Sequence, residues 1–417
     1  MSQIQNLSAM EILDSRGRPT LKATCVLSDG AVGIASVPSG ASTGTAEALE
    51  LQDADPKRYR GMGCLQAVSH VNTDLNNALV NRTFGSQAEL DSALISLDGT
   101  PNKSHLGANA VLAVSLAFAR AVAAERQMPL YAYLAELIDQ PPRHLPRLTI
   151  NLFSGGRHAG GQVAIQDVLI VPLTSTIAQS LEMADEVYRA AAALVYQRYG
   201  MRELKADEGG LAPPFSRSQA MLDDAIAAIE AADLKPGKDM ALAVDIAATQ
   251  FYREDAYHID GQSLDGNGMI ANLLTWLDNY PLVSIEDALA EEDWSHWSRL
   301  RTAVGARALV MGDDLLCTNV SRIQKAIDLG AANALLLKVN QIGTLTEAGA
   351  ALRLARTAGW SVTISARSGE TEDNWLADLA VGWNGDFMKI GSIRQSERLA
   401  KYNRLLEIEG ATSLQMR

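Results

Sequence analysis

Four short apolar runs recur in the second half of the chain, and each ends in a charged residue. They are ALAVD at 241–245, LVSIE at 282–286, ALVMGD at 308–313 and ALLLK at 334–338. Each run lies between segments with helical periodicity, and a strand that is apolar at nearly every position is typical of a parallel sheet buried on both faces. The alternation of such strands with helices predicts an α/β barrel.

The charged ends of these runs predict a functional site. In an α/β barrel the carboxyl ends of the strands face the active site, so we expect Asp245, Glu286 and Asp313 to converge at one mouth, with Lys338 beside them. Three carboxylates and water suit Mg²⁺. A lysine beside a bound cation is a candidate general base, because nearby positive charge and burial lower its pKa. A single strand-end aspartate is often only a helix cap or turn residue, but four in consecutive units favour a site.

The first third of the chain predicts a smaller α+β unit. A β-meander is expected over 4–38, with a hairpin turn at Ser28-Asp29-Gly30, followed by a loop at 38–47 rich in Gly, Ser and Thr. Helical patterns follow at about 62–80, 87–96, 106–126 and 129–138. The Pro-rich segment 139–147 predicts a linker. We therefore expect an N-terminal domain over 1–138 and a catalytic domain over 148–417.

The second domain begins irregularly. Strands are predicted at 148–153 and 164–173, and the segment between them is too short for a crossover helix, so these strands must form an antiparallel hairpin. Two helices follow, near 177–199 and 217–232, with a polar loop between them that carries Glu208. Six strand–helix units complete the chain. The predicted fold is α/β: an eight-stranded, TIM-like barrel of order ββαα(βα)6 after a small α+β domain.

The last two predicted strands add cationic groups. Arg367 and Ser368 follow the strand at 361–365, where a guanidinium and a backbone amide at a helix start are suited to a phosphate. Lys389 lies in the strand at 386–391. Taken singly, Arg367 is equally explained by a surface ion pair, and Lys389 by a solvated strand end.

Composition narrows the class of protein. The 417 residues are 47% hydrophobic and 20% charged, as in globular proteins, and the net charge of −13 argues against nucleic acid or an anionic membrane as partner. Cys25, Cys64 and Cys317 have no metal or disulfide spacing, and the N-terminus has no signal-peptide pattern. The apolar span 108–124 is predicted to be a buried core helix. We expect a cytoplasmic protein.

The motifs along the chain resemble the enolase (phosphopyruvate hydratase) family over nearly the full length. The matching segments occur in the family's order and are dispersed, which makes the resemblance specific. They are EILDSRGRPT at 11–20, PSGASTG at 38–44, DGTPNKS at 98–104, DEGG at 207–210, SIEDALAEEDW at 284–294, GDDL at 312–315, KVNQIGT at 338–344, RSGETED at 367–373 and SERLAKYN at 396–403.

The resemblance implies a role for each matching residue. Asp245, Glu286 and Asp313 look like the ligands of a first Mg²⁺, and Ser42 looks like a residue that helps to bind a second, substrate-dependent Mg²⁺. Lys338 resembles the base and Glu208 the acid that helps hydroxide to leave. The remaining matches are to substrate-binding positions: His158, Gln166, Asp167, Arg367, Ser368 and Lys389. The family also implies a small phosphorylated carboxylate substrate, a homodimer or higher homo-oligomer, and an N-terminal domain that caps the barrel.

Several positions depart from the family pattern. Ala366 replaces a histidine, Asp167 replaces a glutamate, and Ala46 replaces a histidine of the mobile loop. In addition, Ser154 stands where asparagine is usual, and Gln250 replaces a customary glutamate.

Because these changes surround the expected leaving hydroxyl, three functions stay open. The first is a glycolytic enolase, which interconverts 2-phospho-D-glycerate and phosphoenolpyruvate. The second is an enolase-like enzyme for another phosphorylated or phosphonate hydroxy-acid, such as those of phosphonate natural-product pathways that resemble carboxyphosphonoenolpyruvate synthase. The third is a non-catalytic scaffold.

Overall fold

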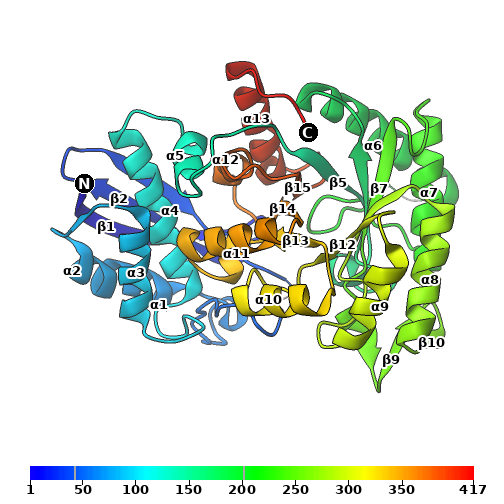
Figure 1. Ribbon diagram of the computed structural model, residues 1–417, viewed down its shortest axis with the longest axis horizontal. Helices are drawn as coiled ribbons and strands as arrows, with labels where there is room; N and C mark the ends of the chain where they lie inside the picture. The colour runs from blue at the N-terminus through cyan, green and yellow to red at the C-terminus, as the bar shows by residue number, and fades with distance from the viewer. Residues whose placement is uncertain (42–43, 201) are drawn as a thin grey trace.

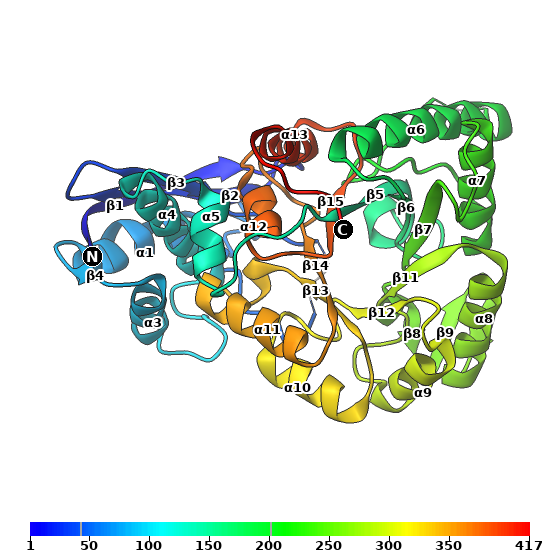
Figure 2. The same cartoon turned by 45° about the horizontal axis from the view of Figure 1, so that its top comes forward.

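The protein consists of a closed eight-stranded barrel and a smaller part built on a four-stranded antiparallel sheet (Figure 1). The computed structural model describes residues 1–41, 44–200 and 202–417. In Figure 2 the N-terminal sheet and its helices lie on one side and the barrel on the other. The predicted fold class is confirmed, including the irregular start of the barrel.

The barrel strands are joined in the order β11-β12-β13-β14-β15-β5-β6-β7, and β7 pairs with β11 to complete the closure. Strand β6 is antiparallel to both of its neighbours, as the short connection after β5 predicted. The strands are β5 (Arg147–Ser154), β6 (Asp167–Pro172), β7 (Met240–Asp245), β11 (Leu282–Glu286), β12 (Leu309–Gly312), β13 (Ala334–Leu337), β14 (Ser361–Ser365) and β15 (Phe387–Gly391).

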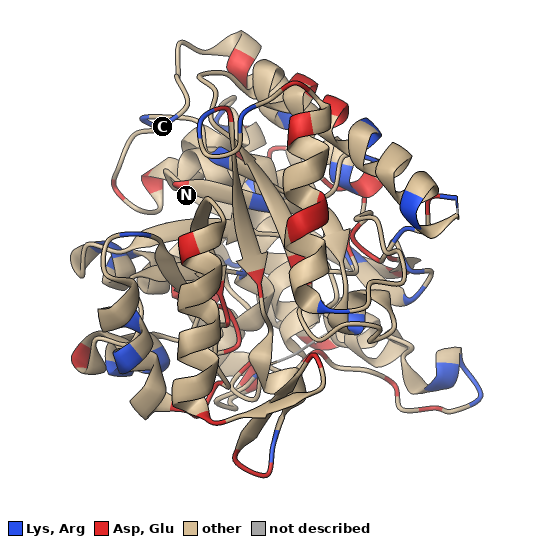
Figure 3. Ribbon diagram, turned by 90° about the vertical axis from the view of Figure 1, so that its right-hand side faces the viewer, with Lys and Arg blue, Asp and Glu red and all other residues tan. Residues whose placement is uncertain are grey.

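Within the described residues, eight helices connect or follow the barrel strands and lie around the barrel (Figure 2). Several begin at a side-chain cap, such as Thr176 and Asn319, and several end at a left-handed glycine, such as Gly200 and Gly330. The helices are α6 (Ile177–Tyr199), α7 (Ser218–Ala231), α8 (Gly266–Asn279), α9 (Trp294–Val304), α10 (Val320–Leu329), α11 (Leu345–Thr357), α12 (Trp375–Gly382) and α13 (Ser396–Ala411). Basic and acidic residues both occur along the outer helices (Figure 3).

The N-terminal sheet has the order β3-β2-β1-β4. Its strands are β1 (Ser2–Leu13), β2 (Pro19–Leu27), β3 (Val32–Ser36) and β4 (Thr83–Phe84). The helices of this part are α1 (Leu65–His70), α2 (Asn76–Leu79), α3 (Gln87–Asp98), α4 (Ala108–Glu125) and α5 (Leu130–Glu136), and a π-helical turn, Val71–Leu75, joins α1 to α2.

Helix α4 packs closely against β3. A Cβ on Gly33 would lie 2.0 Å from the backbone oxygen of Ala117, so only glycine allows this approach. Among the described residues, α4 is the one helix long and apolar enough to cross a membrane, with a mean hydropathy of 1.4. Because 83% of it is buried inside the protein, the predicted core helix is confirmed.

A small antiparallel sheet after β7 was not predicted. Its strands are β8 (Tyr252–Arg253), β9 (Ala256–Ile259) and β10 (Gln262–Leu264). The part of the chain that the structure describes also contains four short 3₁₀ segments, at Tyr59–Gly61, Gly156–Ala159, Ala248–Phe251 and Val339–Gln341.

Backbone contacts join the N-terminal part to the mouth of the barrel. Ser39 and Gly369 exchange two backbone hydrogen bonds, and Ser15 N–H donates to the carbonyl of Glu370. These bonds hold the loops after β1 and β3 against the segment that follows β14. The predicted linker, 139–147, contains no helix and ends where β5 begins; its role as a domain boundary stays a prediction.

Candidate active site

The predicted strand-end groups lie together at one mouth of the barrel. Asp245 and Glu286 end β7 and β11, Asp313 and Lys338 directly follow β12 and β13, and Lys389 lies within β15. Each of the five is 9% exposed or less. Charged groups buried to this extent need partners of opposite charge or a bound ion.

Lys389 joins two of the predicted metal ligands. Its Nζ donates to Asp245 Oδ2 at 2.8 Å and to both Glu286 oxygens at 2.8 and 2.9 Å. Burial raises the pKa of Glu286, and the neighbouring Asp245 raises it further, so this pKa lies well above its usual range. For Asp245, burial is outweighed by Lys389, which lowers the pKa. Two adjacent buried carboxylates with one ammonium retain a strong attraction for a cation.

Asp313 is held by a different lysine from the one that joins Asp245 and Glu286. Lys338 Nζ donates to Asp313 Oδ2 at 2.5 Å, and Gln341 Nε2 donates to Asp313 Oδ1 at 2.7 Å. A lowered pKa is predicted for Lys338 beside a bound cation, and the structure gives the opposite direction. Burial does lower this pKa, but the adjacent Asp313 carboxylate outweighs burial and raises it.

Arg367 and Ser368, the residues predicted to bind phosphate, form hydrogen bonds with other side chains of the protein. Arg367 Nη1 donates to Glu47 Oε2 at 3.0 Å, and Arg367 Nη2 donates to Glu47 Oε1 at 3.3 Å. Ser368 Oγ accepts a hydrogen bond from Arg16 of the loop after β1. Arg398 supports this segment, because its guanidinium donates to the carbonyls of Arg367 and Ser368. The Arg367 guanidinium, which is predicted to bind the substrate phosphate, is therefore paired with the Glu47 carboxylate in this structure.

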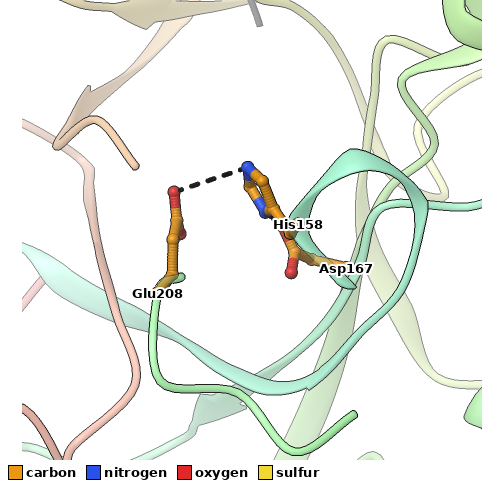
Figure 4. Close-up of side chains that lie close together, drawn as sticks. All are labelled: His158, Asp167 and Glu208. Atoms are coloured by element: carbon orange, nitrogen blue, oxygen red, sulfur yellow. Dashed lines mark hydrogen bonds and ion pairs between the residues drawn. The ribbon is translucent and has the colours of Figure 1, made fainter. Parts of the chain in front are cut away.

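The loop that carries Glu208 is anchored to β5. Leu211 N–H donates to the carbonyl of Leu152 at 2.8 Å, and Ser154 N–H donates to the carbonyl of Leu211 at 2.9 Å. Asn151 Nδ2 then donates to Glu208 Oε2 at 3.1 Å. These bonds hold Glu208 in place, and its carboxylate faces the His158 ring in Figure 4.

His158 lies between Asp167 and Glu208 (Figure 4). Its Nδ1 is 2.9 Å from Asp167 Oδ2, and its Nε2 is 3.9 Å from Glu208 Oε1. The second oxygen of Asp167 accepts from Ser154 Oγ at 2.6 Å. Asp167 is fully buried, so its shorter side chain is held on both oxygens by residues beside it.

The charges around His158 decide where a proton resides. Burial lowers the pKa of His158, but Asp167 and Glu208 outweigh burial and raise it to about 9. Burial raises the pKa of Glu208, but His158 and the cations Arg398, Lys389 and Lys338 lower it overall. At neutral pH, His158 is therefore an imidazolium beside the Glu208 carboxylate.

Two further carboxylates at this mouth, Asp287 and Asp314, were not among the predicted site residues. Asp287, Asp313 and Asp314 have ligand atoms within 4.8 Å of one another, as do His158, Asp167 and Glu208. Asp287 accepts from the backbone N–H groups of Asp313 and Asp314, so it fixes the turn after β12. The signal was present in the sequence, since both strands end in paired acidic residues, Glu286-Asp287 and Asp313-Asp314.

Two other atypical positions, Ala366 and Ala46, and the predicted substrate-binding residue Gln166 also lie near this mouth. Ala366 is buried, and its N–H donates to the carbonyl of Lys389 at 2.8 Å. Ala46 precedes Glu47, the partner of Arg367. Gln166 Nε2 donates to Asp245 Oδ2 at 3.1 Å. Ser42 lies outside the described residues.

Fold and site together define an α/β-barrel protein with buried carboxylates and lysines at the carboxyl ends of its strands. A family model described as "Enolase, C-terminal TIM barrel domain" matches residues 142–415, and one described as "Enolase, N-terminal domain" matches residues 4–134. The chain belongs to the enolase family, and the resemblance stated from its motifs is confirmed. Membership suggests a lyase, a phosphorylated carboxylate substrate and the Mg²⁺ that the family typically binds.

Proposed function

We propose that the protein is a Mg²⁺-dependent carbon–oxygen lyase that interconverts 2-phospho-D-glycerate and phosphoenolpyruvate. The observation that carries this proposal is that two proton-handling groups from different segments reach the same buried site. Lys338 follows β13, whereas the His158–Glu208 pair comes from the loops after β5 and α6. A reaction that removes a proton from one carbon and hydroxide from the next needs such a base and such an acid.

Each group then has a distinct task. In its neutral form, Lys338 Nζ takes the proton from the carbon beside the substrate carboxylate. The His158–Glu208 pair supplies a proton to the departing hydroxide, which leaves as water. Arg367 and Ser368 bind the phosphate after Glu47 is displaced, and Lys389 supports the substrate carboxylate.

The donor set at the mouth fits Mg²⁺. Asp245, Glu286 and Asp313 are hard oxygen ligands from three adjacent strands, and the raised pKa of Glu286 reflects a buried cluster short of positive charge. We propose that these three hold the ion and that Ser42 contributes to a second site. When bound, Mg²⁺ would stabilise negative charge on the substrate carboxylate and compete with Lys338 for Asp313.

A second candidate substrate is favoured by the surroundings of Asp167. Ser154 and His158 engage both oxygens of this shortened side chain, and Ala366 supplies no imidazole. The two departures at 154 and 167 are thus partners in one hydrogen bond. This concerted change supports an enolase-like enzyme that forms an enolate from another phosphorylated or phosphonate hydroxy-acid.

The test is to incubate the purified protein with 2-phosphoglycerate and Mg²⁺ and to follow phosphoenolpyruvate by ultraviolet absorbance. Turnover that is lost in Lys338→Ala supports the first substrate. Failure of the wild type to turn over 2-phosphoglycerate, with turnover of a related hydroxy-acid, supports the second. Turnover that persists in Lys338→Ala contradicts the base assignment.

The family relationship also motivates a cytoplasmic homodimer with the domain division 1–138 and 148–417. Sedimentation velocity tests the oligomer, and limited proteolysis within 139–147 tests the division.

A further inference from the structure

One buried hydroxyl bonds to two residues of the barrel mouth. Thr318 Oγ1 accepts a hydrogen bond from the backbone N–H of Lys338 at 2.9 Å and donates one to Gln341 Oε1 at 2.7 Å. The side chains of Thr318 and Gln341 are both fully buried. The hydroxyl therefore joins the segment after β12 to the residue that follows β13 and to the 3₁₀ segment beyond it.

The two residues that bond to Thr318 are the two that hold Asp313. Lys338 Nζ donates to Asp313 Oδ2 at 2.5 Å, and Gln341 Nε2 donates to Asp313 Oδ1 at 2.7 Å. Each oxygen of this carboxylate thus has a partner that is itself bonded to the same hydroxyl.

The direction of each hydrogen bond in this network is fixed. The Asp313 carboxylate, ion-paired with Lys338, can only accept, so Gln341 presents its NH₂ group to Asp313 and its Oε1 to Thr318. The Thr318 hydroxyl must therefore donate to Gln341, and its oxygen accepts from the Lys338 backbone. A hydroxyl can donate and accept at once, whereas a methyl group in its place can do neither.

The backbone that carries this hydroxyl is in a costly conformation. Cys317 and Thr318 have φ of 47° and 50°, in the left-handed region that is rare for residues other than glycine and most of all for a β-branched one. The Asp313 carbonyl accepts from the N–H groups of Leu316 and Cys317, so the chain turns back just before Thr318. Such a conformation persists where surrounding contacts hold it, and it is found most often at functional sites. A glycine at 318 would remove the strain and also the hydroxyl.

We infer that Thr318 is a positioning residue that fixes Asp313 and Lys338 at the barrel mouth, the first through the Gln341 amide and the second through its backbone. This inference rests on the proposed function, in which Asp313 binds Mg²⁺ and Lys338 is the base. Once Mg²⁺ displaces Lys338 Nζ from Asp313, the carboxylate keeps its Gln341 bond and Lys338 keeps its backbone bond. Both of these remaining bonds depend on Thr318.

The test compares T318V, which keeps the branched shape and deletes the hydroxyl, with T318S, which keeps the hydroxyl. Mg²⁺ is titrated into the substrate-free protein by calorimetry. T318V should bind Mg²⁺ about tenfold more weakly than the wild type, the lower end of what loss of a supporting partner costs a metal site, and T318S should stay within about twofold. T20V, which deletes a buried hydroxyl bonded to the Val37 carbonyl in the N-terminal part, is the matched control and should leave Mg²⁺ affinity unchanged.

Turnover separates positioning from mere support of the fold. With 2-phosphoglycerate and saturating Mg²⁺, T318V should lower kcat about tenfold and change KM by less than about twofold, because the base is displaced while the phosphate-binding residues are not. T318S should restore kcat. A hydroxyl that only stabilises the fold would lower the unfolding temperature of T318V and leave kcat and Mg²⁺ affinity as in the wild type, which overturns the inference. The Mg²⁺ titration decides if the wild type does not turn over 2-phosphoglycerate.

A double-mutant cycle with Q341M tests the route to Asp313. In the Q341M background, T318V should change Mg²⁺ affinity by less than about twofold, because the intermediary amide is absent, and an undiminished effect overturns the inference. If T318V does not fold, T318C takes its place, since its thiol is a weaker donor and acceptor and should give an intermediate loss of Mg²⁺ affinity. Equal binding by T318C and T318S overturns the inference and leaves the proposed function intact, whereas a wild type that binds no Mg²⁺ overturns both.

Discussion

Ser154 Oγ donates a hydrogen bond of 2.6 Å to Asp167 Oδ1 across the antiparallel pair β5 and β6, where the two residues are paired in register. His158 engages the other oxygen of Asp167. The shortened carboxylate is therefore drawn toward β5 and the imidazole, and its charge acts on His158.

Removing that charge should change the titration of His158. Asp167 is the largest influence raising the pKa of His158 to about 9, so D167N should bring this pKa down. NMR titration of the imidazole protons measures the change. D293N, beside the more exposed His296, is the matched control and should leave His158 unchanged.

The raised pKa of His158 also predicts how the free energy of unfolding depends on pH. The pKa of His158 is raised on folding, so its contribution is fully present below the unfolded value of about 6.5 and is lost as the pH rises through about 9. The unfolding free energy of the wild type should fall over that interval more than that of D167N. Identical pH profiles would contradict the assignment.

Restoring the usual pocket residues should shift substrate preference. A366H supplies the missing imidazole, and D167E moves the carboxylate by roughly 1–1.5 Å, a displacement that can be costly in catalysis. The double variant should gain activity toward 2-phosphoglycerate relative to the wild type, measured as kcat/KM. Because Asp167 is fully buried, D167E alone should destabilise the fold by about 1–3 kcal/mol. D185E, on α6, where Asp185 pairs with Arg189 and Arg394, controls for the longer side chain.

Glu47 should compete with anions for Arg367. E47Q keeps the shape of this side chain and removes the charge that now engages the guanidinium. Calorimetry with inorganic phosphate should show affinity about tenfold tighter, on the scale of one hydrogen bond to a charged group. E292Q, which alters a more exposed partner of Arg322, should have no effect on phosphate. Weaker phosphate binding in E47Q would mean that Glu47 holds Arg367 in its binding position.

Lys338 should stabilise the fold by neutralising Asp313. K338M leaves this buried carboxylate without its ammonium, and breaking a buried pair costs about 3–5 kcal/mol. Thermal unfolding should show the loss without Mg²⁺ and a partial recovery when Mg²⁺ is added, since the ion supplies the missing charge. K57M, on an exposed loop, should behave as the wild type with and without the ion. A K338M protein that Mg²⁺ does not stabilise would contradict the proposed ligand role of Asp313.

The sequence predicted the barrel because its strands are apolar on both faces, and it located the charged groups because each ends such a strand. The small sheet at 252–264 was missed. Its first turn uses Glu254 and Asp255 at φ of 52° and 56°, without the glycine that marks a tight hairpin. Its second turn, Asp260-Gly261 at φ of 50° and 77°, is an Asp-Gly hairpin signal that was present in the sequence. The raised pKa of Lys338 was also beyond sequence reasoning, because it depends on the 2.5 Å approach of Asp313.

The pairing of β5 with β15 has a consequence for biosynthesis. The first barrel strand, Arg147–Ser154, hydrogen bonds to the last, Phe387–Gly391. A nascent chain therefore keeps an open sheet edge until nearly all of it has left the ribosome, and closure must bring together segments very distant in sequence. Such non-local pairing is slow and exposes unpaired strands to other chains. Refolding yield should thus fall steeply with protein concentration, and truncation before residue 387 should leave a product that aggregates.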